Sequence, residues 1–163
     1  MIVNKVVELL KENNLTIGSI ESLTGGLFAS IITEVPGVSK VYKGSVVSYA
    51  TEVKKDVVRV NEKVIETYGV VSKECALEMA KSGQLLLKTD IMVSFTGNAG
   101  PDVLEGKDAG LVYIAIAIKK DIEVYELRLT GTRDIVRKKC VEYAFDKIFE
   151  KLSRTFKKNC VIN

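Results

Sequence analysis

Two apolar segments of strand length constrain the fold of this chain most tightly. Residues 90–96 (DIMVSFT) and residues 111–118 (LVYIAIAI) are short, almost continuous apolar runs. Runs of this length are typical of strands that are buried on both faces, as in a sheet with helices on each side. A chain of 163 residues is long enough to build such a layered core. The two segments therefore predict a buried sheet rather than a bundle of helices.

Helical and strand patterns alternate along the rest of the chain. The expected strands are residues 17–21, 45–50, 90–96, 111–118 and 122–129, of which the last two form an antiparallel hairpin. The expected helices are residues 3–13, Thr24 to the Pro36–Gly37 breaker, 52–58, 61–67, a helix capped by Ser72, and a long helix opened by Thr132. This order predicts the α/β class. We expect a three-layer α/β/α sandwich with a mixed, mostly parallel sheet and one antiparallel strand, in a single domain over residues 1–163.

The chain contains no histidine. Ser-His-Asp and Cys-His catalysis are therefore excluded, as are histidine-based zinc and iron sites. Its three cysteines, Cys75, Cys140 and Cys160, are widely separated and match neither a zinc pattern nor a disulfide framework. We expect no metal and no cofactor. Any catalytic base must be a lysine, a tyrosine, a carboxylate or a thiolate.

Charge and hydropathy point to a cytoplasmic protein. The formal net charge is +3, and hydrophobic residues make up 47% of the chain. No apolar run approaches the roughly 20 residues that a membrane span requires, and the N-terminus lacks a signal-peptide pattern. The mild positive charge favours a small anionic ligand and does not call for nucleic acid or a membrane as a partner.

Polar residues follow three of the predicted strands. They are Glu21–Ser22, Tyr49 with Lys54, and residues 96–101 (TGNAGP). The carboxyl ends of parallel strands share one edge of a sheet, so we expect these groups to converge. Ser22 needs a proton acceptor, and a desolvated Lys54 is the natural one, with Tyr49 relaying a proton or orienting the lysine. The glycine-rich loop can direct N–H groups at an oxyanion or a phosphate.

Each of these features also has an ordinary structural interpretation. Residues 22–26 can be a capped helix start, although Gly25 and Gly26 favour close approach of a ligand or another backbone segment. Lys54 lies in a charged segment that is typical of solvated surface. Tyr49 can belong to the core, and residues 96–101 can be a sharp turn. Arg133 and Arg137 can bind a phosphate or pair with nearby carboxylates.

Taken together, these segments resemble the CinA C-terminal domain family, the nicotinamide-nucleotide amidases also called PncC. Residues 21–26 (ESLTGG) are similar to the family signature E-S-C-T-G-G, and residues 96–101 resemble T-G-I-A-G-P. Lys54 lies five residues after Tyr49, as the family lysine does. The remaining similar segments, in the same order as in the family, are residues 36–39, 42–49, 68–72, 110–115 and the G-x-R-x-x-x-R of residues 131–137.

The resemblance implies an amidase that converts nicotinamide mononucleotide into nicotinate mononucleotide and ammonia. It implies that Ser22 is the nucleophile and that Tyr49 and Lys54 activate it, without metal or cofactor. It also implies a homodimer with a small nucleotide amide as its partner. The substrate-binding residues that it suggests are Glu21, Thr24, Gly25, Gly26, Thr96, Gly97, Asn98, Ala99, Gly100, Arg133 and Arg137.

Four departures from the family pattern surround the expected pocket. Asn98 replaces an apolar residue, and residues 103–106 (VLEG) replace a pair of glycines. Residues 49–51 (YAT) replace Y-S-N, and residues 108–110 (DAG) replace P-V-G. These changes leave the catalytic trio intact. They leave two alternatives open: a nucleotide- or phosphate-binding module with little catalysis, and a competence-related interaction protein.

Overall fold

The computed structural model describes residues 1–157, which contain one five-stranded sheet in the order β2-β1-β3-β4-β5. The strands are β1 (Ile17–Glu21), β2 (Tyr42–Val47), β3 (Ile91–Gly97), β4 (Leu111–Ile118) and β5 (Asp121–Arg128). β1 pairs in parallel with β2 and β3, whereas β4 is antiparallel to both β3 and β5. Four strands therefore run in one direction and β4 runs in the other. The α/β class and the mixed sheet with one reversed strand are confirmed.

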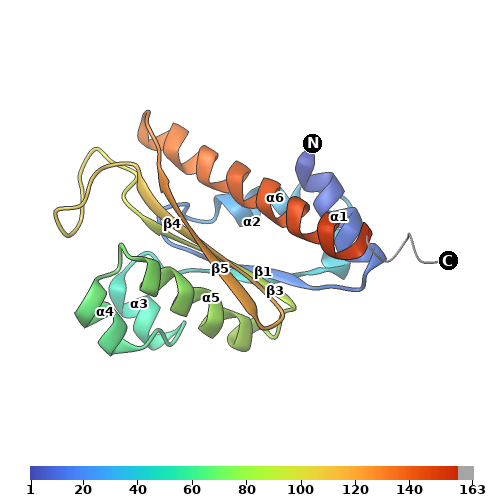
Figure 1. Cartoon of the computed structure of the whole chain (residues 1–163), viewed down its shortest axis with the longest axis horizontal. Coiled ribbons are helices and arrows are strands. Elements are labelled where there is room, and N and C mark those ends of the chain that lie inside the picture. The colour runs from blue at the N-terminus through green and yellow to red at the C-terminus, as the bar shows by residue number, and fades with distance from the viewer. Residues whose placement is uncertain (158–163) are drawn as a thin grey trace.

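Helices cover both faces of the sheet (Figure 1). They are α1 (Ile2–Glu12), α2 (Leu27–Thr33), a 3₁₀ turn η1 (Val38–Lys40), α3 (Thr51–Asp56), α4 (Glu62–Tyr68), α5 (Lys73–Leu87) and α6 (Arg133–Lys157). α1, α2 and α6 lie on one face, and α3, α4 and α5 lie on the other. Among these described helices, none combines the length and apolarity of a membrane span. The three-layer arrangement expected from the sequence is confirmed.

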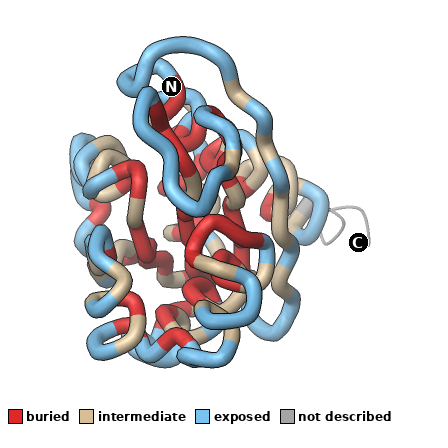
Figure 2. The backbone as a smooth tube through the Cα atoms, turned by 90° about the vertical axis from the view of Figure 1, so that its left-hand side faces the viewer, coloured by how far each residue is buried: buried red, intermediate tan, exposed pale blue. Residues whose placement is uncertain are grey.

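The two faces of the sheet are packed with side chains of different size. On the α6 face, large apolar residues of β3 and β4 meet Phe28 and Phe145, whose rings stack with centroids 4.5 Å apart. On the α5 face, β4 presents the small residues Ala115 and Ala117. Figure 2 looks onto the edge of the sheet and shows buried backbone at its centre with exposed loops around it. Small side chains let α5 approach the strands closely, because a helix backbone can then lie nearer to the sheet.

Two elements begin three residues away from the predicted position. The helix expected from Thr24 begins at Leu27, because Gly25 and Gly26 have φ values of +58° and +97° and cannot continue an α-helix. The strand expected at 45–50 runs from Tyr42 to Val47, because its pairing with β1 starts at Tyr42. The glycines therefore set the start of α2, whereas pairing with a neighbouring strand, which local apolarity does not report, sets the start of β2.

The cysteines in the described part of the chain belong to the core. Cys75 on α5 and Cys140 on α6 are both fully buried and unpaired. Burial raises the pKa of Cys75 to about 11, so its thiol stays protonated and unreactive near neutral pH. Both residues therefore act as small apolar side chains, as expected. Cys160 lies outside the described residues.

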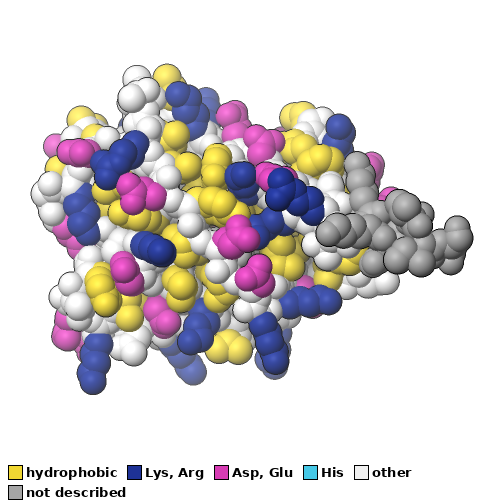
Figure 3. All heavy atoms as spheres, viewed as in Figure 1, with side chains coloured by type: hydrophobic (Ala, Val, Ile, Leu, Met, Phe, Trp, Pro, Cys, Tyr) yellow, Lys and Arg dark blue, Asp and Glu magenta, His cyan; other side chains and the backbone are white. Residues whose placement is uncertain are grey.

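Charges of both signs are mixed on the surface. On the face shown in Figure 3, lysine and arginine side chains alternate with aspartate and glutamate over α5, β5 and α6. Most of the ion pairs are exposed, as between Lys138 and Asp134 or Arg154 and Glu150 on α6. Such pairs contribute little to stability. The face shown in Figure 3 therefore carries mixed charge over these three elements.

The close packing of α5 makes Gly83 a sensitive position. A Cβ atom there would overlap the buried side chain of Ile20, with Cδ1 only 2.7 Å away. Alanine favours a helix over glycine by about 1 kcal/mol, but overpacking costs about 1–3 kcal/mol. Because Ile20 is fully buried and two of its atoms would overlap the new Cβ, we expect a cost of about 2–3 kcal/mol. After the gain in helix propensity, Gly83→Ala should lower the free energy of unfolding by about 1–2 kcal/mol in urea titrations. The exposed control Lys81→Ala should change it by less than about 0.5 kcal/mol; equal effects would contradict this packing.

Candidate active site

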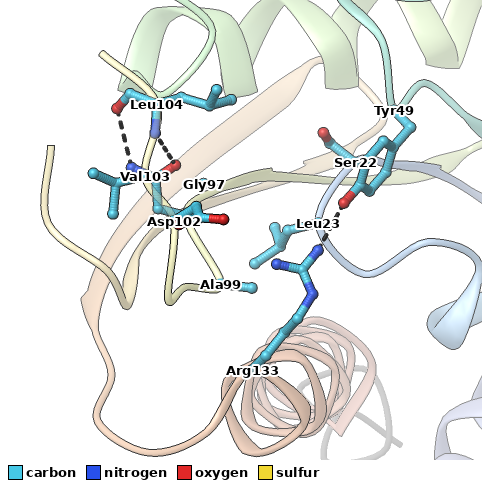
Figure 4. A pocket seen from close by; sticks show the side chains of 10 residues that line it. Ser22, Leu23, Tyr49, Gly97, Ala99, Asp102, Val103, Leu104 and Arg133 are labelled. Carbon is cyan, nitrogen blue, oxygen red and sulfur yellow. Dashed lines mark hydrogen bonds between the residues drawn. The ribbon is translucent and has the colours of Figure 1, made fainter. Parts of the chain in front are cut away.

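The carboxyl ends of three strands meet at one edge of the sheet and border a pocket. Ser22 follows β1, Tyr49 follows β2, and the loop after β3 faces both of them (Figure 4). Together with Arg133 from the start of α6, these segments line a cavity of about 320 Å³. The structure thus brings Ser22, Tyr49, Arg133 and the Gly97–Ala99 segment into one site. This is the place where open α/β sheets commonly hold ligands.

Lys54 is buried with its amine against Ser22, which lines the pocket. Its side chain is only 2% exposed, although it lies on α3, in a segment rich in charged residues. Its Nζ lies 3.0 Å from Ser22 Oγ, 2.6 Å from the carbonyl oxygen of Ser48 and 3.5 Å from that of Tyr49. The structural alternative of a solvated Lys54 is therefore wrong. A buried lysine in this position can exchange a proton with Ser22.

The surroundings of Lys54 also bear on its protonation. Desolvation by burial lowers the pKa of Lys54, while the nearby Cys75 acts weakly in the opposite direction. A neutral amine keeps two N–H donors and gains one lone pair. The two carbonyl oxygens of Ser48 and Tyr49 can accept those donors, which leaves the lone pair for the hydroxyl of Ser22. The site can therefore accommodate Lys54 as a base.

Tyr49 takes a different part in the site from the one expected. Its side chain is 60% exposed, so it does not belong to the core. Its hydroxyl oxygen accepts a hydrogen bond of 2.7 Å from Arg133, which also donates to the carbonyl oxygen of Gly100 at 2.9 Å. The link from Tyr49 to Lys54 is through the backbone carbonyl and not through the phenol. Arg133 thus joins the β2 end, the β3 loop and α6 at the rim of the pocket.

Glu21 was expected to bind substrate, but its carboxylate is occupied by the backbone. It is fully buried and accepts N–H bonds from Gly26 at 3.0 Å, Phe28 at 3.2 Å and Ala29 at 3.0 Å. The hydroxyl of Ser19 donates a further bond at 3.1 Å. A carboxylate here satisfies free N–H groups at the start of α2 and complements the helix dipole. This accounts for Glu21 without a ligand.

Several other expected binding residues also have structural partners. Arg137 donates to the carbonyl oxygens of Leu23 and Thr24 at 3.1 Å and 2.8 Å, so its guanidinium is used within the chain. Thr96 donates from Oγ1 to the carbonyl oxygen of Val70 at 2.6 Å and so ties β3 to the segment before α5. Thr24 is fully buried. Gly25 and Gly26 shape the turn through their positive φ values and, like Thr24, are not among the residues that line the pocket.

Asn98 holds the loop that forms the far wall of the pocket. Its side-chain oxygen accepts from the N–H of Leu104 at 3.0 Å. Its side-chain nitrogen donates to the carbonyl oxygens of Leu104 and Lys107 at 3.2 Å and 3.0 Å. The polar residue that departs from the family pattern thus stabilises the loop from inside. Asn98 was expected to bind substrate, but its side chain mainly fixes the shape of the loop.

A second anchor fastens the same loop to the segment between α4 and α5. Glu105 accepts from the backbone N–H groups of Val70 and Val71 at 2.8 Å and 2.9 Å and pairs with Lys107 at 3.3 Å. Lys107 also donates to the carbonyl oxygens of Tyr68 and Val71. Although desolvation opposes it, the N–H donors and Lys107 together lower the pKa of Glu105. The pocket wall is therefore held by charged side chains bound to backbone groups.

Four pocket residues were not among those predicted from the sequence. They are Leu23, Asp102, Val103 and Leu104. Figure 4 shows the side chain of Leu23 close to the guanidinium of Arg133, and the carboxylate of Asp102 on the opposite wall. The replacement of a glycine pair by residues 103–106 was the one signal that could have pointed to this wall. The hydrogen bonds of Asn98 and Glu105 decide which side of this loop faces Ser22, and the sequence does not show those bonds.

The family model for the CinA C-terminal domain matches residues 1–152. The chain belongs to the CinA C-terminal domain family. Two similar relatives are competence-damage inducible proteins of Bacillus cereus strain G9842, 48% identical over 149 residues, and of Bacillus cytotoxicus, 45% identical over 150 residues. Each match covers 91% of this chain but 36% of the relative, so this chain spans about a third of the length of those proteins.

Solved structures of CinA-superfamily proteins have the same fold. One from Klebsiella pneumoniae 700603 is 28% identical, with a TM-score of 0.91 over 94% of this chain and 96% of that one. The competence/damage inducible protein CihA from Agrobacterium tumefaciens is 27% identical, with a TM-score of 0.84 over 92% and 95% of the two chains. These likenesses extend over more than nine tenths of this chain.

The Glu105 anchor predicts a pH-dependent contribution to stability. Because the folded-state pKa of Glu105 is lowered, its contribution is present above the unfolded pKa of about 4.3 and is lost as the pH falls through the folded pKa. Glu105→Gln should therefore lower the free energy of unfolding by about 1 kcal/mol at pH 7 and by much less at pH 3. Denaturant titrations at the two pH values measure this difference. Asp108→Asn, in the same loop but 83% exposed, should have little effect at either pH. An equal loss from Glu105→Gln at both pH values would contradict the assignment.

Proposed function

We propose that the protein is an amidase that hydrolyses nicotinamide mononucleotide to nicotinate mononucleotide and ammonia. The observation that carries the proposal is the buried Lys54 amine 3.0 Å from the Oγ atom of Ser22, a residue that lines the pocket. The membership in the CinA C-terminal domain family, which the sequence resemblance links to nicotinamide-nucleotide amidases, supplies the substrate class. A homodimer in the cytoplasm belongs to the same proposal.

In the proposed mechanism, Lys54 moves one proton at each step. Ser22 Oγ attacks the amide carbon while its proton passes to Lys54 Nζ. Lys54 then returns this proton to the amide nitrogen as the C–N bond breaks, so ammonia leaves and an acyl ester remains on Ser22. A water molecule attacks the ester and gives a proton to Lys54, which passes it to Ser22 Oγ as the acid is released. The site thereby performs with a lysine what other hydrolases perform with histidine.

Arg133 has the position to receive an anionic part of the substrate. It is exposed at the rim of the pocket, where its guanidinium is held by Tyr49 Oη and the Gly100 carbonyl oxygen. A guanidinium that is already fixed in place can bind a phosphate with little loss of conformational freedom. We assign Arg133 this role and assign Arg137, which is bound to the turn after Ser22, a structural one.

Ammonia release from nicotinamide mononucleotide tests the proposal. Ser22→Ala and Lys54→Met should each lower kcat/KM by at least about a thousandfold, since each removes the nucleophile or its base. Lys55→Met is a matched control, because Lys55 is the next residue but pairs with Glu62 on the surface. It should retain activity within about twofold. Binding of the nucleotide without ammonia release would favour the alternative of a binding module, and neither binding nor release would overturn the proposed function.

The burial of Lys54 predicts the pH dependence of the reaction. Lys54 must be neutral to accept a proton, so kcat/KM should rise with pH and level off above the pKa of Lys54. Because burial lowers that pKa, the midpoint should fall below the ordinary lysine value of about 10.4. A profile of kcat/KM between pH 6 and pH 10 measures the midpoint. A midpoint at or above the ordinary value would show that Lys54 is not the base.

A further inference from the structure

The side chain of Glu21 closes a small ring of backbone that contains Ser22. Its Oε2 accepts the N–H of Gly26 at 3.0 Å. This hydrogen bond joins the two ends of the segment and closes a ring around residues 22–25. Within the ring, the N–H of Gly25 donates to the carbonyl oxygen of Ser22 at 3.0 Å. The other carboxylate contacts, with Phe28 and Ala29, fasten the ring to the start of α2.

Arg137 holds the same ring from the outside. It reaches over from α6 and donates to the carbonyl oxygens of Leu23 and Thr24, the two residues after Ser22. Its guanidinium lies close enough to the turn that a Cβ atom at Gly25 would be 3.6 Å from Nη2. The carboxylate of Glu21 therefore accepts from an N–H group of the turn, and the guanidinium of Arg137 donates to two of its carbonyl oxygens.

Glu21 also links the turn to the lysine. Its backbone carbonyl oxygen accepts the N–H of Ser48 at 2.8 Å, and the carbonyl oxygen of Ser48 accepts from Lys54 Nζ at 2.6 Å. Glu21 thus fixes the Ser22 turn through its side chain. Through its main chain it fixes Ser48, whose carbonyl oxygen binds Lys54. Displacement of the turn would change the separation of Ser22 Oγ and Lys54 Nζ directly.

We propose that Glu21 and Arg137 are positioning residues that clamp the Ser22 turn and set the distance between the nucleophile and Lys54. This inference rests on the proposed role of Ser22 as a nucleophile. Neither residue lines the pocket, and the carboxylate of Glu21 is fully buried in its bonds to the backbone, so neither is assigned contact with substrate. Displacements of about 1 Å in such geometries change rates by roughly a hundredfold.

The test measures the reactivity of Ser22 itself, with a small uncharged alkyl fluorophosphonate followed by intact-protein mass spectrometry. In this reaction the Ser22 Oγ–P bond forms, the P–F bond breaks, fluoride leaves, and the serine proton passes to Lys54. Glu21→Gln replaces one acceptor oxygen with an N–H donor that opposes the backbone N–H groups. We expect Glu21→Gln and Arg137→Met to slow labelling about tenfold to a hundredfold. The pH midpoint should stay unchanged, because Lys54 remains buried and burial is the main cause of its lowered pKa. Arg137→Lys, which reaches one carbonyl at a time, should recover part of the rate.

A matched control separates positioning from a general loss of stability. Asp90 also accepts a backbone N–H, from Thr16 at 2.8 Å, but at the opposite edge of the sheet from the pocket. Asp90→Asn should lower the melting temperature and leave the labelling rate unchanged. Full labelling rates in both clamp variants would overturn the clamp while leaving Ser22 as a nucleophile. Labelling of wild type no faster than of Ser22→Ala would overturn the proposed function and the clamp together.

Discussion

The site depends on one buried amine. Lys54 is almost completely buried. Its Nζ lies against Ser22 Oγ and the carbonyl oxygens of Ser48 and Tyr49. All three follow the carboxyl ends of β1 and β2, so the parallel pairing of these strands supplies the partners that make the burial tolerable. The same burial lowers the pKa of Lys54 and thereby suits it to act as a base. The proposed chemistry depends on this burial, because a lysine that was solvated or paired with a carboxylate would stay protonated.

Around this centre, the loops are held by side chains bound to backbone groups rather than by apolar contacts. Glu21 and Arg137 hold the turn after β1, Asn98 and Glu105 hold the loop after β3, and Arg133 bridges the rim. Such bonds give a loop one conformation at modest net cost, because each buried N–H or carbonyl group gains a partner. The family model matches residues 1–152, and the solved structure from Klebsiella pneumoniae has the same overall fold. The polar substitutions in this chain thus reinforce the wall of the pocket, and residues 102–104 change the surface it presents.

Much of the site was predictable from the sequence, for specific reasons. The absence of histidine restricted the base to a few residue types, and Lys54 and Ser22 lie next to the ends of neighbouring strands. The roles of Glu21 and Arg137 were not predictable, because a motif shows that a charge is present and does not show which way it points. Glu21 looked like a pocket residue since it precedes Ser22, yet its side chain turns back toward α2. Tyr49 was expected to relay a proton or to orient Lys54, but its hydroxyl accepts a hydrogen bond from Arg133.

The sequence by itself determined the class of fold and the set of reactive groups. Apolar runs and helical periodicity are local properties, and they suffice to specify strands, helices and their order. Only the tertiary structure decided the state and direction of each group. Burial, the pKa of Lys54 and the partners of Glu21, Asn98 and Arg137 depend on residues that are distant along the chain, such as the 113 and 114 positions that separate Arg137 from the two carbonyls it binds. Burial and long-range hydrogen bonds therefore decide which of the candidate residues meet in the pocket and which stabilise its walls.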